Sequence, residues 1–251
     1  MSMKKFENTI TMAGILVKHT FEEATYGTNN DIECIRGEVI IRTADEGEHS
    51  VRFFANKYKR DEKGNFTSEE NKIYKSLGTV MNEYRTLEEY PDDPDYVEIT
   101  SASFGVNDYL NKNTNEVITF NTISTNFINR ITKEKYEASS PTAKFEVAGV
   151  IANIKDEIIK DTPTGNLIVT MNVINQTKKG NGKDAIYEVK DMFPLKLNVS
   201  ADLADTFKST YSEGVFAKVY GDVINRTEIT TTTEKVVFGS DIVKTFTNTV
   251  R

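Results

Sequence analysis

The stretch VRFFANKYKR, residues 51–60, alternates between two kinds of side chain and so predicts a β-strand with one buried face. Val51, Phe53 and Ala55 fall on one phase, which we expect to point into a core. The other phase is basic and aromatic together, and it comprises Arg52, Phe54, Asn56, Tyr58 and Arg60. The stretch therefore predicts both a core strand and a candidate binding face.

The first half of the chain predicts five β-rich segments and one helix. The segments lie near residues 8–19, 31–43, 49–59, 96–104 and 117–129. The helix is expected over 68–89, where apolar side chains recur at spacings of three and four residues.

The second half predicts the same order, with strands near residues 144–154, 166–176, 186–197, 215–225 and 235–245. Ser200 is the expected N-cap of its helix, Gly214 the expected end, and Leu203, Phe207 and Tyr211 the expected apolar face. Residues 12–16 (MAGIL) and 147–151 (VAGVI) echo each other, and a Phe-Glu pair precedes both. With a polar linker at 133–142, this repeat predicts domains at 1–138 and 143–251 with a boundary near Ser140.

Five strands with a helix between the third and fourth is the element order of the OB-fold, a small Greek-key barrel. We therefore predict an all-β chain of two OB-fold-like five-stranded barrels, while other five-stranded barrels stay open as an alternative. The face of strands 2 and 3 commonly binds oligonucleotides in this fold.

Composition narrows the class of protein. Cys34 is the single cysteine, and residues 1–8 lack the apolar run of a signal peptide. No stretch reaches the roughly 20 apolar residues that cross a bilayer. We expect a cytoplasmic protein without a membrane role.

The net charge of −7 opposes binding of nucleic acid by bulk attraction. The excess is local, because residues 1–140 hold 24 acidic and 17 basic side chains, whereas residues 141–251 hold 14 of each. Much of it lies in the run EEYPDDPD, residues 88–95, which we interpret as a solvated surface loop that keeps negative charge away from a basic groove.

The paired starts at 12–16 and 147–151, and the turn PTGN at 163–166 before the strand LIVTMNV, resemble phage-type single-stranded DNA-binding proteins with tandem OB-folds. The resemblance implies single-stranded DNA as the partner, with RNA and self-association left open. Bacterial members end in an acidic tail that recruits partners, whereas this chain ends FTNTVR, so recruitment of replication or recombination proteins by that route is not indicated.

Several side chains outside the opening stretch are further candidates for nucleic-acid contact. Arg36 and Arg42 share the outward phase of the preceding strand and are assigned to phosphates, with cross-strand pairing to Glu38 or Glu48 as the alternative. Tyr109 and Lys112 lie in an expected loop at 107–113, which could equally be a plain hairpin tip. Lys190 is the candidate of the second half, where residues 178–183 are interpreted as a basic loop and not a P-loop.

No motif indicates an enzyme, a metal or a cofactor. His19 and His49 are the only histidines, neither has a metal-ligand spacing, and we expect satisfied surface or strand-end side chains.

Two functions compete. The first is sequence-tolerant coating of single-stranded DNA in phage or plasmid replication and recombination, with a salt slope of about −0.7 per phosphate neutralised. Against it stands the alternative that Phe54 or Tyr58 is buried by a neighbouring element and that the cations form an ordinary solvated face. The second function is a structural assembly module of a phage or mobile element.

Overall fold

The computed structural model describes residues 5–45, 47–61, 63–112, 114–139, 142–179, 186–234 and 242–250. The chain divides into two compact units, each built from several segments. Unit 1 comprises residues 1–10, 103–122 and 145–221, and unit 2 comprises residues 11–102, 123–144 and 222–251. The predicted boundary near Ser140 lies outside the described residues, and the division at 138–143 stays a prediction.

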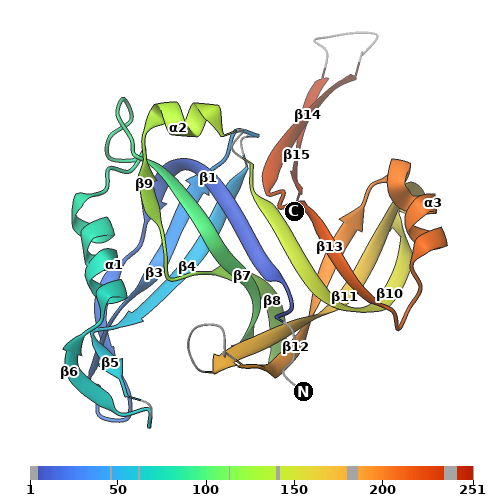
Figure 1. Ribbon diagram of the computed structural model, residues 1–251. Helices are drawn as coiled ribbons and strands as arrows, with labels where there is room; N and C mark the ends of the chain where they lie inside the picture. The colour runs from blue at the N-terminus through green and yellow to red at the C-terminus, as the bar shows by residue number, and fades with distance from the viewer. Residues whose placement is uncertain are drawn as a thin grey trace. The chain divides into compact units, whose positions relative to one another are not determined.

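The described part of the chain is mostly β (Figure 1). In the first half the elements are β1 (Asn8–His19), β2 (Glu22–Tyr26), β3 (Ile32–Arg42), β4 (Glu48–Asn56), β5 (Tyr58–Arg60), β6 (Phe66–Glu70), α1 (Lys72–Glu83), β7 (Tyr96–Asn111), β8 (Glu116–Ser124), β9 (Asn129–Ile131) and α2 (Lys133–Ala138). In the second half they are β10 (Lys144–Ile159), β11 (Thr162–Lys179), β12 (Ile186–Val199), α3 (Ala201–Thr210), β13 (Phe216–Asp222), β14 (Arg226–Glu234) and β15 (Ile242–Val250).

The antiparallel pair β3–β4 forms the centre of unit 2. Its register places Ile35 opposite Ala55 and Val39 opposite Val51. The inward phase predicted for Val51, Phe53 and Ala55 is confirmed, because all three are buried, and Ile35, Val39 and Ile41 of β3 are buried beside them.

Strand pairing around β3 and β4 has a nearly cyclic order, in which β7 and β8 contribute residues to both units. The pairs run from β1 to β3, β4, β8 and β7, and β7 pairs again with β1. One link is a single parallel pair, Arg52 with Ser124, so the ring is only loosely closed. Two OB-type barrels, and a clean barrel in either unit, therefore remain a prediction.

Helix α1 is shorter than the predicted 68–89. Residues 68–70 belong to β6, which pairs with β5, and the Asn71 side chain caps the helix by accepting from the Ile73 N–H at 3.0 Å. Tyr84 ends the helix in an extended conformation. The buried face of α1 consists of Tyr74, Leu77 and Val80, which recur at three-residue spacing as an amphipathic helix requires.

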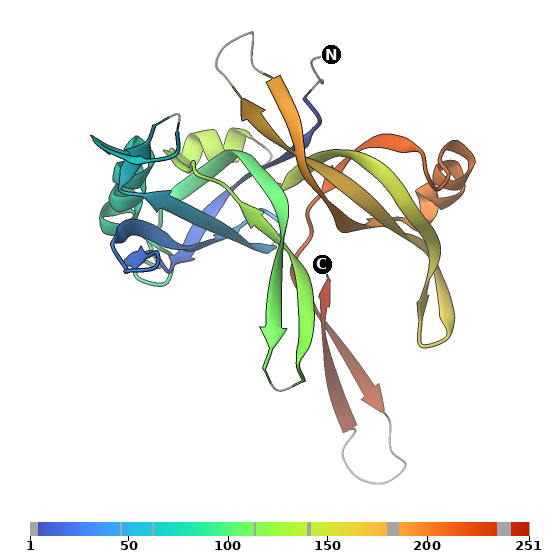
Figure 2. The same cartoon turned by 90° about the horizontal axis from the view of Figure 1, so that it is seen from below.

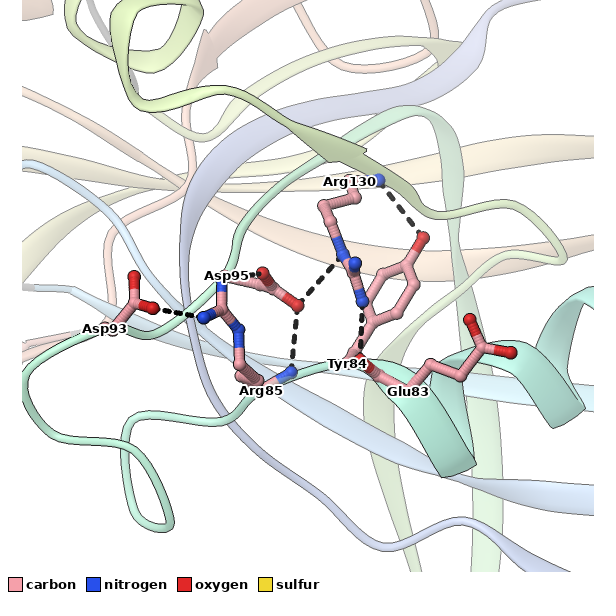
Figure 3. Close-up of polar contacts among 6 residues, drawn as sticks. All are labelled: Glu83, Tyr84, Arg85, Asp93, Asp95 and Arg130. Atoms are coloured by element: carbon pink, nitrogen blue, oxygen red, sulfur yellow. Dashed lines mark hydrogen bonds and ion pairs between the residues drawn. The ribbon is translucent and has the colours of Figure 1, made fainter.

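The acidic run 88–95 ends in a buried carboxylate, contrary to its interpretation as a wholly solvated loop (Figure 3). Asp95 is 4% exposed and accepts from the Arg85 backbone N–H at 2.8 Å. The Arg130 Nε lies 2.9 Å from the same Oδ2, and the Arg130 guanidinium stacks over Tyr84 at 4.3 Å. Asp92 and Asp93 are exposed, as expected. The sequence pattern around Asp95 could not predict its burial, because the ion pair that makes burial possible is formed with Arg130, which is distant along the chain.

Unit 1 is built on the sheet β13–β10–β11–β12, drawn in yellow to red-orange in Figure 2. Its core includes Val147, Ile151, Val169, Met171 and Phe193. Helix α3 follows Ser200 at the predicted N-cap position, although no side-chain cap bond forms there. Phe207 and Tyr211 contact each other with tilted rings whose centroids are 4.9 Å apart, but Leu203 is exposed and Ala204 is the buried residue of the helix.

The C-terminal strands differ from the prediction of one strand at 235–245. Residues 226–234 form β14, which pairs antiparallel with β15 from Arg226–Val250 to Glu234–Ile242. Residues 235–241 lie outside the described part of the chain.

The two echoing Ala-Gly pairs occupy equivalent strand crossings. A Cβ on Gly14 of β1 would lie closer than 3.0 Å to the Arg42 carbonyl oxygen of β3, and a Cβ on Gly149 of β10 would lie as close to the Asn172 carbonyl oxygen of β11. Both contacts involve backbone, which cannot move aside cheaply. The sequence repeat thus corresponds to a repeated close approach of two strands.

We expect Gly149→Ala to destabilise the protein by about 2 kcal/mol, because the added methyl group overpacks a backbone contact. The matched control is Gly105→Ala, whose Cβ would meet its first neighbour, Thr122 Oγ1, at an ordinary 3.6 Å. Urea unfolding followed by circular dichroism measures both. Equal stability of the two variants would contradict the importance of the close approach.

We expect Asp95→Asn to lower the free energy of unfolding by about 2 kcal/mol, because charged hydrogen bonds to Arg130 and Arg85 are weakened. Asp92→Asn removes the same charge at an exposed position and should change stability by less than about 0.5 kcal/mol. Thermal and urea unfolding measure the stability of both variants. An equal loss of stability in Asp95→Asn and Asp92→Asn would contradict a stabilising role of the Asp95 ion pairs.

Candidate nucleic-acid interface

The outward face of β2, β3 and β4 in unit 2 brings half of the predicted site residues together. Register places Arg36 opposite Phe54 across β3–β4, and Arg36 also lies opposite Glu22 across β2–β3. Arg52 lies opposite Glu38 on the same pair of strands. Because side chains alternate between the faces of a strand, Arg36, Arg42, Arg52, Phe54 and Asn56 share the outward side.

Phe54 is the exposed aromatic side chain at the centre of this face. It is 46% exposed, so the alternative that a neighbouring element buries it is wrong. Tyr26 of β2 packs edge-on against it, with ring centroids 5.6 Å apart, and the Tyr26 hydroxyl donates to Asn56 Oδ1 at 2.7 Å. Asn56 therefore positions Tyr26, and the two rings form an aromatic pair beside the arginines.

The prediction from sequence missed Tyr26 because it did not include β2. The segment EEATY at 22–26 is short and follows β1 after only two residues, so it did not separate from that strand. The turn residues at 27–30, a glycine and two asparagines among them, were the signal that marked a hairpin.

A second aromatic group lies on the hairpin β5–β6. The predicted strand over 49–59 is interrupted after Asn56, so Tyr58 and Arg60 belong to β5 and not to β4. Tyr58 is exposed, and the Arg60 guanidinium stacks over Phe66 of β6 at 3.9 Å while it donates to the Gly64 carbonyl at 2.6 Å. The stacking places the Arg60 cation next to the Phe66 ring, so this hairpin presents a positive charge and an aromatic side chain together.

Each arginine of the outward face is held by a glutamate from a neighbouring strand. The pairs are Arg36–Glu22 at 2.8 Å, Arg42–Glu48 at 2.6 Å and Arg52–Glu38 at 2.8 Å. The predicted alternative of pairing is confirmed for Arg42, whereas Arg36 pairs with Glu22 of β2 and not with Glu38. These side chains are about one third to three fifths exposed, so each pair adds little to stability.

Glu38 is the most constrained of these carboxylates. It accepts from Ser50 Oγ at 2.6 Å and from Arg52 Nε at 2.8 Å. The hydrogen bond from Ser50, together with the bond and charge of Arg52, holds the pKa of Glu38 below its ordinary value despite partial burial. Glu38 is therefore ionised at neutral pH.

The remaining predicted site residues belong to unit 1. Tyr109 is 56% exposed and lies within β7, so the expected loop over 107–113 is largely strand, and Lys112 is an exposed residue of the turn that follows. Lys190 of β12 is exposed and lies 3.8 Å from Asp191 Oδ2. Of the predicted basic loop, residues 180–183 lie outside the described part of the chain.

The expectation of a satisfied surface or strand-end side chain holds only in part, because both histidines lie at strand ends, His19 as the last residue of β1 and His49 as the second residue of β4, but neither is a fully satisfied surface side chain. His49 is buried, with Nε2 3.2 Å from Thr43 Oγ1, and burial lowers its pKa in spite of nearby Asp45. His19 stacks on Phe21, and its Nδ1 is buried without a hydrogen-bond partner in the described structure. Burial likewise lowers the pKa of His19.

Two further features bear on function, namely a cluster of metal ligands and a helix suited to a bilayer. Those residues contain no group of three or more His, Cys, Asp or Glu side chains arranged to hold a metal ion. Within the same ranges, no helix has the length and apolar character needed to span a bilayer.

Comparison with solved structures gives similarities at low sequence identity. The wild-type single-stranded DNA-binding protein from Thermus aquaticus matches with a TM-score of 0.47 and 9% identity, over 89% of this chain and 87% of that one. A replication protein A heterotrimer bound to single-stranded DNA matches with a TM-score of 0.25 and 11% identity, over 96% of this chain and 49% of that one. No curated protein matches the sequence.

A family model matches almost the entire chain. The YorF family model aligns with residues 7–251, a range that includes all of unit 2 and all of unit 1 except residues 1–6. The protein belongs to the YorF family.

Proposed function

We propose that this protein binds single-stranded DNA with little sequence preference and carries out no chemistry of its own. The observation that supports the proposal most is the exposed ring of Phe54, paired with the partly exposed Tyr26, among the arginines of β3 and β4. Tyr58 and the Arg60–Phe66 stack on β5–β6 add further exposed rings to unit 2. Aromatic rings with flanking cations are what single strands require, because their bases are free to stack.

Base stacking contributes more to affinity at this face than phosphate attraction does. A base on an aromatic ring contributes about 1–3 kcal/mol, whereas a phosphate must compete with Glu22, Glu38 or Glu48 for its arginine. We therefore expect a shallower salt dependence than the arginine count alone predicts. Base stacking also explains how a chain with a net charge of −7 could bind nucleic acid.

The finer proposal places this activity in replication or recombination of phage or plasmid DNA, in the cytoplasm of the host. Two OB-type barrels would supply the binding surfaces, with Tyr109, Lys112 and Lys190 as secondary contacts of unit 1. Binding of RNA and self-association of the protein are left open, and binding measurements would distinguish each of them from binding of single-stranded DNA.

An assembly module is the second candidate, and one observation favours it. The hairpin β7–β8 carries large exposed apolar side chains, namely Val106, Tyr109, Leu110, Val117, Ile118 and Phe120. Exposed apolar surface on this scale is typical of protein contacts. Single-strand binding ranks first because assembly alone gives no reason for the aromatic and basic face of β3 and β4.

The test is a titration of fluorescent oligo-dT with the wild type and with Phe54→Ala/Tyr58→Ala. Loss of two stacking rings should weaken binding by at least tenfold, from about 1–3 kcal/mol per ring. Both side chains are exposed, so the fold should survive the change.

The matched control is Tyr220→Ala, which removes an 81% exposed ring of unit 1 and should bind oligo-dT like the wild type. Absence of binding by the wild type at low salt would refute the proposal and leave the assembly module. Equal affinity of Phe54→Ala/Tyr58→Ala and the wild type would place binding elsewhere.

A further inference from the structure

We infer that Glu22, Glu38 and Glu48 are specificity-determining residues, which make the face of β2, β3 and β4 favour single-stranded over double-stranded DNA. The inference rests on the proposed function, because it concerns discrimination at the same site. It assigns these carboxylates a role in rejecting the wrong ligand in addition to their contacts within the fold.

The geometry places one carboxylate beside each guanidinium. Glu22, Glu48 and Glu38 lie 2.8, 2.6 and 2.8 Å from Arg36, Arg42 and Arg52, respectively. Register sets these residues opposite each other, so the carboxylates share the outward side of the strands with the arginines. Three negative charges thus balance three positive charges over the face.

The exposure of these glutamates keeps their charge at the surface. Their side chains are 58%, 37% and 44% exposed for Glu22, Glu38 and Glu48. A buried pair would act mainly on stability, but a half-exposed carboxylate lies where a ligand phosphate must come. Glu38 is the most firmly placed of the three, since Ser50 Oγ donates to it at 2.6 Å.

The two forms of DNA meet this neutralised face differently. A duplex carries about one charge per 1.7 Å and keeps its base faces stacked inside, so it offers this face its phosphates but no base for an aromatic ring to stack on. Every carboxylate repels those phosphates, and no stacking compensates. A single strand offers its bases to Phe54, Tyr26 and Tyr58, so it gains affinity that does not depend on charge.

The size of the effect follows from Coulomb's law. Two unit charges about 6 Å apart in a water-like dielectric change an affinity about threefold. Removing all three carboxylates should therefore raise duplex affinity about thirtyfold. The gain for oligo-dT should be smaller, because fewer phosphates contact the face at once.

The experiment compares the wild type with Glu22→Gln/Glu38→Gln/Glu48→Gln, using fluorescent oligo-dT and a blunt duplex of equal length at several salt concentrations. Glutamine keeps the shape and one acceptor oxygen for Ser50 and the arginines, and circular dichroism melting confirms folding. We expect the ratio of single-strand to duplex affinity to fall about tenfold. The duplex salt slope should steepen by about −0.9 for each arginine released.

The charge-matched control is Glu98→Gln/Glu134→Gln/Glu137→Gln, which removes three carboxylates of unit 2 that do not pair with Arg36, Arg42 or Arg52 and do not lie on β2 to β6. This variant should retain the wild-type ratio of affinities.

The remaining outcomes separate the inference from the proposed function. If the wild type binds oligo-dT and Phe54→Ala/Tyr58→Ala weakens it, while the glutamine variant keeps the wild-type ratio, only the inference fails. Weaker oligo-dT binding by the glutamine variant would also overturn it, because the glutamates would then organise the site. No binding of oligo-dT by the wild type overturns both.

Discussion

The antiparallel pairing of β3 with β4 is the constraint on which the rest of unit 2 depends. Because side chains alternate, one register both buries Val39 against Val51 and sets Arg36 beside Phe54 on the opposite side. A slip of one residue would exchange the core with the face. Helix α1 reinforces the register from the core side, where Gly78 approaches the Ile35 side chain. The same hydrogen-bonded ladder therefore determines the fold and the candidate site.

The candidate site combines exposed rings with cations that are already neutralised. This arrangement differs from a basic groove, in which phosphate attraction dominates affinity. In the proposed binding mode, Phe54 and Tyr26 would supply affinity that is insensitive to charge, while the pairs Arg52–Glu38 and Arg36–Glu22 leave no net charge on the face. The net charge of −7 disfavours binding that depends on phosphate attraction, but it does not oppose binding in which base stacking is the main source of affinity.

Local periodicity predicted the strands and their phases, and distant contacts account for most of what it missed. The inward set on β3 and β4 was predictable because Ile35, Val39 and Val51 follow a period of two. The partner of Arg36 was not, since Glu22 lies on a strand too short to stand out. Asp95 was misinterpreted as solvated, because the side chain that pairs with it in the buried position is Arg130 of β9, which lies far away in the sequence. Long-range pairing of charges leaves no periodic signal in the sequence.

The most direct test of the central claim is to locate the bound strand by photo-crosslinking. Single-stranded DNA containing 5-iodouracil would be irradiated with the wild-type protein, and the crosslinked peptides identified by mass spectrometry. We expect crosslinks to Phe54 and Tyr58, on which the bases would stack because these rings are exposed, and to the partly exposed Tyr26 beside Phe54. Crosslinks confined to unit 1, for example at Tyr220, with none on β2, β4 or β5 would contradict binding at this face.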